Sequence, residues 1–172
     1  MEPRRRGRAG ACGGSASITA VSVLSSCFAA ARVSGHCYIV AEAGSNHDRD
    51  LGRALALVDA AAEAGVDAVK FQLFHAGHLY PSLAGVADYL GGADISEVIA
   101  AAALPEAWLP ELAHRAQTRE IDLLVTPFDE AAIDLVDPFV PAFKVASYEL
   151  THEPLLAAIA ARGKPVILST GA

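Results

Sequence analysis

From residue 37 onward, short runs of continuously apolar residues alternate with stretches of helical periodicity. The apolar runs span 38–41, 67–71, 121–126, 142–146 and 165–169. Between them, apolar residues recur at spacings of three and four, which is typical of amphipathic helices at 51–64, 105–116, 129–136 and 154–161. Continuously apolar strands separated by helices predict a parallel sheet with helices packed on it. The expected fold class is therefore α/β, with about five strand–helix units and a long connection between 72 and 104.

Two α/β architectures fit this pattern, an open doubly wound sheet and a (β/α)8 TIM barrel. Polar side chains at the carboxyl end of each expected strand distinguish them, and these are Glu42, Lys70, Gln72, Thr126, Lys144, Ser147, Ser169 and Thr170. A barrel collects its catalytic residues from all strands at this end, whereas an open sheet binds ligands at one switch point, often with a G-x-G-x-x-G turn. That motif is absent from the sequence. We therefore expect an incomplete TIM barrel of about five βα units, truncated before the last strands.

The first 36 residues differ in composition from the rest. They carry five arginines and one acidic residue, Glu2, followed by an apolar run at 18–31. This pattern fits a signal-like segment, in which Leu24-Ser25-Ser26-Cys27 has the spacing of a lipoprotein processing site, or a disordered extension or misassigned start. The run is shorter than the roughly 20 residues of a membrane-spanning helix. We expect two regions, an N-terminal extension at 1–36 and a barrel segment at 37–172, with no membrane span.

The net charge limits which macromolecules the chain can bind, and the cysteine content indicates its cellular compartment. The chain has a net charge of −7, and because its first 36 residues are basic, the remainder is more acidic still. An acidic body lacks the basic face that nucleic acid requires, so nucleic acid is excluded as a partner. Cys12, Cys27 and Cys37 form no C-x-x-C pair and are odd in number. Neither a disulfide framework nor a thiolate zinc site is indicated, and a cytoplasmic location is expected.

Five segments, in order along the chain, resemble the N-terminal part of the catalytic barrel of the sialic acid synthase (N-acetylneuraminate synthase) family. They are IVAEAGSNH at 39–47, VKFQ at 69–72, VTPFD at 125–129, FKVASYE at 143–149 and GKPVILSTG at 163–171. The resemblance implies a transferase of carbohydrate biosynthesis that condenses phosphoenolpyruvate with an N-acyl hexosamine, of the N-acetylmannosamine type. The products are a nonulosonic (sialic) acid and phosphate. It also implies a divalent metal, Mn²⁺ or Mg²⁺, and a homodimer for the complete enzyme.

The resemblance also implies roles for individual residues. It places Lys70, Thr126, Lys144, Ser147 and Ser169 around phosphoenolpyruvate, Gln72 and Glu149 on the sugar, and Glu42 as the catalytic carboxylate. Two lysines and several hydroxyl donors suit a substrate with a carboxylate and a phosphate. Each assignment has a plainer alternative, because a lysine at a strand end can be solvated or ion-paired and a serine or threonine there can cap the next helix.

Metal ligands are not expected within this chain, since the resemblance places the family's histidine ligands on later strands. His75 and His78 have i, i+3 spacing, but the sequence shows no carboxylate or third ligand in register with them. The pair alone therefore does not indicate a metal site.

Several other functions stay open on the sequence alone. The chain could be part of another phosphoenolpyruvate-using aldol synthase, or of a Schiff-base aldolase with Lys70 or Lys144 as the nucleophile. It could also be a non-catalytic half-barrel or a truncated gene product. Because five strands do not close a barrel, we expect the chain alone to be inactive.

Overall fold

The computed structural model describes residues 35–79 and 94–171. The extension expected at 1–36 lies almost wholly outside the described residues. In the described part of the chain, no helix has both the length and the apolar character needed to cross a membrane.

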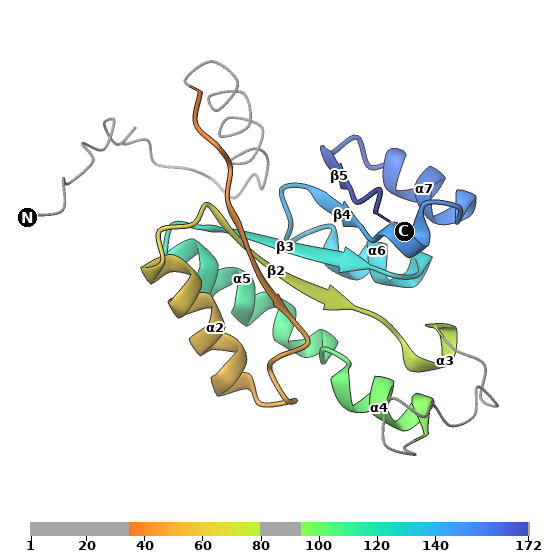
Figure 1. Ribbon diagram of the computed structural model, residues 1–172, viewed down its shortest axis with the longest axis horizontal. Coiled ribbons are helices and arrows are strands. Elements are labelled where there is room, and N and C mark those ends of the chain that lie inside the picture. Colours follow the sequence, from red (N-terminus) through yellow and green to blue (C-terminus); the bar gives the residue numbers. More distant parts are fainter. Residues whose placement is uncertain (1–34, 80–93, 172) are drawn as a thin grey trace, which may run out of the picture.

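Five strands and six α-helices make up the described chain (Figure 1). The strands are β1 (Val40–Gly44), β2 (Ala68–Leu73), β3 (Asp122–Pro127), β4 (Phe143–Val145) and β5 (Val166–Leu168). The helices are α2 (Leu51–Glu63), α3 (Ala76–Leu79), α4 (Ile95–Ala102), α5 (Leu109–Thr118), α6 (Glu130–Val136) and α7 (Glu153–Ala160), with 3-10 turns η2 (Glu106–Trp108) and η3 (Ser147–Glu149). The expected alternation of strands and helices is confirmed.

The sheet has the strand order β1-β2-β3-β4-β5, and every neighbouring pair is parallel. A doubly wound sheet reverses its strand order at a switch point, and no such reversal occurs among these strands. Right-handed crossovers that always advance in one direction place all their helices on one face, as in a barrel wall. The structure is therefore a five-stranded segment of a parallel barrel.

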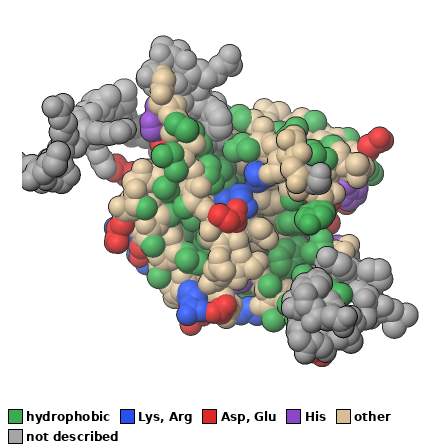
Figure 2. Space-filling model, viewed as in Figure 1, with side chains coloured by type: hydrophobic (Ala, Val, Ile, Leu, Met, Phe, Trp, Pro, Cys, Tyr) green, Lys and Arg blue, Asp and Glu red, His purple; other side chains and the backbone are tan. Residues whose placement is uncertain are grey.

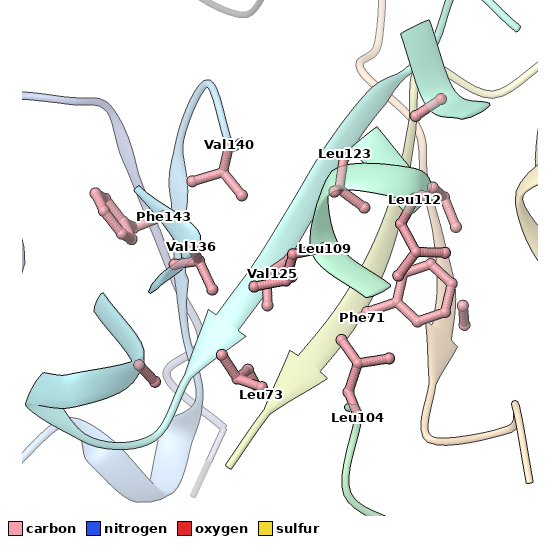
Figure 3. Close-up of a cluster of buried hydrophobic side chains, with 14 of the residues drawn as sticks. Phe71, Leu73, Leu104, Leu109, Leu112, Leu123, Val125, Val136, Val140 and Phe143 are labelled. Carbon is pink, nitrogen blue, oxygen red and sulfur yellow. The ribbon is translucent and has the colours of Figure 1, made fainter. Parts of the chain in front are cut away.

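Successive residues of each strand face opposite sides of this wall. In β2, Val69, Phe71 and Leu73 belong to the buried cluster that packs against the helices. Figure 3 shows Phe71 and Leu73 in this cluster together with Leu109 and Leu112 of α5. The residues that alternate with these along each strand therefore point away from the helices and form the inner face of the sheet.

The inner face changes from apolar to polar along the strand direction. Ala68 and Ala142, at the amino ends of β2 and β4, form a small buried cluster with Leu124, which lies opposite Lys70 in β3. Two residues further along β2 and β4, Lys70 and Lys144 occupy the same face. The carboxyl end of the wall is thus the end that presents polar groups.

Strand β1 ends in a bulge that positions Glu42. The pairing with β2 runs from Glu42 opposite Lys70 to Gly44 opposite Phe71, so one residue is left out of register. Gly44 has a φ of 55°, and a Cβ there would lie 3.1 Å from Oε1 of Glu42. A glycine is required because this backbone conformation and the close carboxylate both disfavour a side chain.

Among the sequence-based expectations that the structure corrects are the bounds of the first strand and the connection between 72 and 104. Strand β1 covers Val40–Gly44 rather than 38–41, because the bulge extends its pairing with β2. The connection expected between 72 and 104 contains two helices, α3 and α4, and Asp94 caps α4 by accepting a hydrogen bond from the Ser96 backbone N–H at 2.8 Å. These two helices contact each other beyond the carboxyl end of β2 (Figure 1).

The two outer strands carry exposed apolar side chains. Val40 in β1 and Val166 and Leu168 in β5 are more than a third exposed, as is Ile39 just before β1. Val166 and Leu168 pair with Phe143 and Val145, which face the helices, and in a closed (β/α)8 barrel the outer ring of helices covers this face. An exposed apolar sheet edge also favours self-association.

We predict that Asp122→Asn stabilises the fold at pH 7. Burial, and secondarily the charge of Asp67, raise the pKa of Asp122, while a hydrogen bond from the Tyr38 hydroxyl at 2.5 Å opposes the rise. The native state therefore binds the carboxyl proton more tightly than the unfolded chain, and the ionised group destabilises the fold above this raised pKa. Lowering the pH through the raised pKa removes that destabilisation.

The measurement is urea unfolding of both proteins between pH 7 and pH 4. The advantage of Asp122→Asn should shrink as the pH falls, because the native carboxyl becomes neutral. Asp50→Asn, which keeps a good helix cap on α2, is the matched control. An Asp122→Asn protein that is less stable than the native chain at pH 7 would contradict the prediction.

Candidate functional site

One pocket at the carboxyl end of the sheet brings together the eight residues to which the family resemblance gave a role, whereas Thr170, the last of the expected strand-end polar residues, does not line it. Its lining includes Glu42, Lys70, Gln72, Thr126, Lys144, Ser147, Glu149 and Ser169. Its volume is about 610 Å³, which falls within the range of small-molecule sites. Figure 2 shows basic and acidic side chains side by side near the middle of this face, with hydrophobic side chains around them.

Lys70 and Glu42 form an ion pair across β1 and β2. Nζ of Lys70 lies 2.5 Å from Oε2 of Glu42. The two partners differ in exposure, since the Lys70 side chain is 9% exposed and the Glu42 side chain is 54% exposed. Lys70 therefore offers a nearly buried positive charge, and Glu42 reaches from it into the open part of the pocket.

Lys144 is the second cation of the pocket. Its Nζ donates to Oγ of Ser169 and to the backbone carbonyl of Val145, each at 2.6 Å. Burial and the nearby charge of Lys70 lower the pKa of Lys144, and Glu42 partly opposes the effect. Two ammonium groups that repel each other in a partly buried site are stabilised by an anion bound between them.

Thr126 has a buried hydroxyl without a partner. Its Oγ1 makes no hydrogen bond to any described residue, although the side chain is only 2% exposed. Such a group normally pairs with protein, water or ligand, because burying it unpaired is costly. Oγ1 of Thr126 is therefore available as a hydrogen-bonding group for a ligand in the pocket.

The helix-capping alternative for Thr126 and Ser147 is not supported. The residues at the N-cap positions of α6, η3 and α7 are Asp129, Ala146 and His152. Asp129 alone of these supplies a side-chain cap, by accepting a hydrogen bond from the Ala132 backbone N–H at 2.8 Å. The hydroxyls of Thr126 and Ser147 are thus not used as caps by the helices that follow them.

The side of the pocket formed by β2, α3, α4 and η3 carries both polar and apolar side chains. Glu149 lies in η3, and its Oε2 contacts Nδ1 of His152 at 3.2 Å. Apolar and aromatic side chains that the sequence reasoning missed also line the pocket: Leu79, Ile99, Phe128 and Tyr148. Phe128 directly follows the Thr126-Pro127 pair, so its position next to a strand end was the available signal.

The pocket does not form a complete metal site from described residues. Its lining contains two carboxylates, Glu42 and Glu149, and no histidine or cysteine. A different group, His75, His78 and Asp129, gathers beside the pocket without lining it.

This arrangement defines a polar pocket at the carboxyl end of a barrel wall, lined by two lysines and several hydroxyl-bearing side chains. Residues 57–172 match the NeuB family, and the chain belongs to that family.

The similarity extends to named relatives and to a solved structure. The chain is 43% identical over 136 residues to the spore coat polysaccharide biosynthesis protein SpsE of Bacillus subtilis, covering 77% of this chain and 36% of SpsE. It is 40% identical over 141 residues to an N,N'-diacetyllegionaminic acid synthase of Legionella pneumophila, covering 78% of this chain and 40% of that synthase. The N-acetylneuraminic acid synthetase of Leptospira borgpetersenii, solved with citrate, has a TM-score of 0.68 and 31% identity over 78% of this chain and 44% of that protein. The chain thus spans less than half the length of these relatives.

Proposed function

We propose that this chain forms the phosphoenolpyruvate-binding part of a nonulosonic acid synthase. The observation that carries the proposal is the convergence of Lys70, Lys144 and three hydroxyl-bearing residues, from four strand ends, on one pocket. Phosphoenolpyruvate carries a carboxylate and a phosphate, and each needs charge-assisted donors in a partly buried site. Family membership and the synthases among the relatives support the same assignment.

The proposed reaction joins the terminal CH2 carbon (C3) of phosphoenolpyruvate to the aldehyde carbon of an open-chain N-acyl hexosamine. As this carbon–carbon bond forms, the aldehyde oxygen takes a proton, and the neighbouring carbon that bears the phosphate (C2) becomes an oxocarbenium centre. Water adds to that centre, and the carbon–oxygen bond to phosphate then breaks. Lys70 and Lys144 hold the anionic groups throughout, which fixes the enol in place and stabilises its charge.

Glu42 is the proposed catalytic group. Its carboxylate reaches into the open part of the pocket from the bulge of β1, where Lys70 holds one oxygen. In that position it can orient the attacking water and accept its proton. Gln72 and Glu149, which line the same pocket, are proposed to bind the hexosamine hydroxyl and amide groups. The divalent metal of the proposed reaction is assigned to the complete enzyme.

A direct test is calorimetric titration of phosphoenolpyruvate into the 172-residue chain. We expect saturable binding with one site, and competition by inorganic phosphate, because the pocket holds the phosphate group. Absence of saturable binding by a folded chain would contradict the proposal.

A second candidate, a Schiff-base aldolase, draws on the lowered pKa of Lys144. A less basic lysine is a better amine nucleophile near neutral pH. Borohydride reduction in the presence of pyruvate separates the two functions. A covalent adduct at Lys144 would favour the aldolase, and its absence together with phosphoenolpyruvate binding favours the synthase.

We predict that the 172-residue chain alone does not turn over. Five strands leave the pocket open on the side between β5 and β1, so water is not excluded from the reacting groups. The measurement is phosphate release with phosphoenolpyruvate, N-acetylmannosamine and Mn²⁺. Steady release above the rate without protein would show that the 172-residue chain suffices.

A further inference from the structure

Three side chains from two segments of the chain meet beside the pocket. His75 follows β2, His78 lies in α3, and Asp129 precedes α6. Oδ2 of Asp129 lies 2.6 Å from Nδ1 of His75 and 3.0 Å from Nδ1 of His78. This group supplies the third, carboxylate ligand that the sequence did not place near the two histidines.

The ligand atoms are close to the spacing that a metal ion needs. Zinc–nitrogen and zinc–oxygen bonds of about 2.0–2.1 Å at tetrahedral angles separate ligand atoms by roughly 3.3 Å. In the structure, Oδ2 of Asp129 is 2.6 and 3.0 Å from the two histidine nitrogens, and ligand atoms of all three residues lie within 4.8 Å of one another. A metal ion can therefore take the place of the protons that lie between the Asp129 carboxylate and the two imidazoles. This requires side-chain movements of about 1 Å.

The surroundings of the group match those of metal ligands. Nε2 of His75 lies 2.8 Å from Oε1 of Glu106, and metal-bound histidines usually pair their second ring nitrogen with a carboxylate. Oδ1 of Asp129 accepts the Ala132 backbone N–H, which leaves Oδ2 for the ion. Glu106 thus orients the His75 ring, and the start of α6 orients the Asp129 carboxylate.

Exposure provides an entry route for an ion and a place for water. The Asp129 side chain is 9% exposed, the His75 side chain 29% and the His78 side chain 63%. An ion reaches the group from the His78 side, and a water molecule can complete four-coordination there. Two imidazoles and one carboxylate favour zinc and similar transition metals over magnesium or calcium, which prefer all-oxygen sites.

We propose that His75, His78 and Asp129 bind one divalent ion, zinc or a similar transition metal. The bound ion links α3 to the start of α6. Leu79 follows His78, Phe128 precedes Asp129, and both neighbours line the pocket. The ion therefore holds two parts of the pocket wall together without contacting the pocket itself. This site is separate from the metal of the proposed synthase reaction.

The test is Co²⁺ titration of the 172-residue chain, followed by visible absorption and displacement with Zn²⁺. We expect one saturable set of tetrahedral Co²⁺ bands. His78→Ala, at an exposed position, should weaken binding at least 100-fold, and Glu106→Gln should weaken it about 10- to 100-fold. His114→Ala, an exposed histidine on α5 outside the group, is the matched control and should bind like the native chain.

A second readout is thermal unfolding with and without Zn²⁺. The ion should raise the melting temperature of the native chain and of His114→Ala, and should leave that of His78→Ala unchanged. Circular dichroism establishes that each variant is folded. Absence of saturable bands, or equal binding by the native chain and His78→Ala, would show that the three side chains form only a hydrogen-bonded contact. Co²⁺ bound at the cysteines would still bind to His78→Ala. The comparison of the native chain with this variant therefore also distinguishes cysteine binding from the proposed site.

Discussion

Phe71→Ala is expected to lower the free energy of unfolding by about 3–5 kcal/mol, the usual cost of removing a buried aromatic ring. Phe71 is fully buried in the cluster between β2 and the helices (Figure 3). Domains are typically stable by only about 5–15 kcal/mol, so this loss is a large part of the total. Urea unfolding followed by circular dichroism measures it.

Two variants make this measurement specific. Phe71→Leu keeps most of the buried volume and should cost much less than Phe71→Ala. Tyr148→Ala removes an aromatic ring that is 86% exposed, and should change stability by no more than about 0.5 kcal/mol. A loss below about 1 kcal/mol in Phe71→Ala would mean that the ring is not packed as the structure has it.

Lys70→Met and Lys144→Met are each expected to weaken phosphoenolpyruvate binding by about 10- to 100-fold. A charged hydrogen bond contributes roughly 1.5–3 kcal/mol, and each 1.4 kcal/mol corresponds to a factor of ten in affinity. Methionine keeps the length and packing of the lysine stem while removing its charge. Lys70→Met leaves Glu42 unpaired, but that carboxylate is half exposed and stays solvated.

The third lysine of residues 37–172 provides the control. Lys164 does not line the pocket, and its Nζ donates to the Val140 carbonyl at 3.0 Å. Lys164→Met removes the same charge from the chain and should leave the affinity for phosphoenolpyruvate within about twofold. Equal weakening by all three substitutions would indicate attraction by net charge rather than a bound site.

The sequence was sufficient to predict the strands because buried parallel strands are continuously apolar. It was less informative about α3 and α4, which are short and lie within a stretch that was interpreted as a connection. Asp94 followed by Ile95, Val98 and Ile99 was the available signal for α4, since a capping aspartate precedes apolar residues at helical spacing. Element boundaries depend on pairing partners, as the bulge at Gly44 shows, and these are not visible in one strand alone.

The candidate pocket could be predicted because the carboxyl ends of parallel neighbouring strands meet at one edge of the sheet. Lys70 and Lys144 therefore come together although they are far apart in sequence. The group of His75, His78 and Asp129 could not be predicted in the same way. The sequence indicates Asp129 as the start of a helix, and its Oδ1 does cap α6. Its Oδ2 instead contacts His78, a contact between distant residues that the sequence pattern does not show.

The order of the strands has a consequence for how the chain folds during translation. Each strand is hydrogen-bonded only to its neighbours in sequence, and no described pairing joins distant strands. Contacts of short sequence separation form fastest, and a growing polypeptide leaves the ribosome from its amino end. The wall can therefore assemble strand by strand during translation, with Lys70 and Glu42 in place before Lys144 has been synthesised.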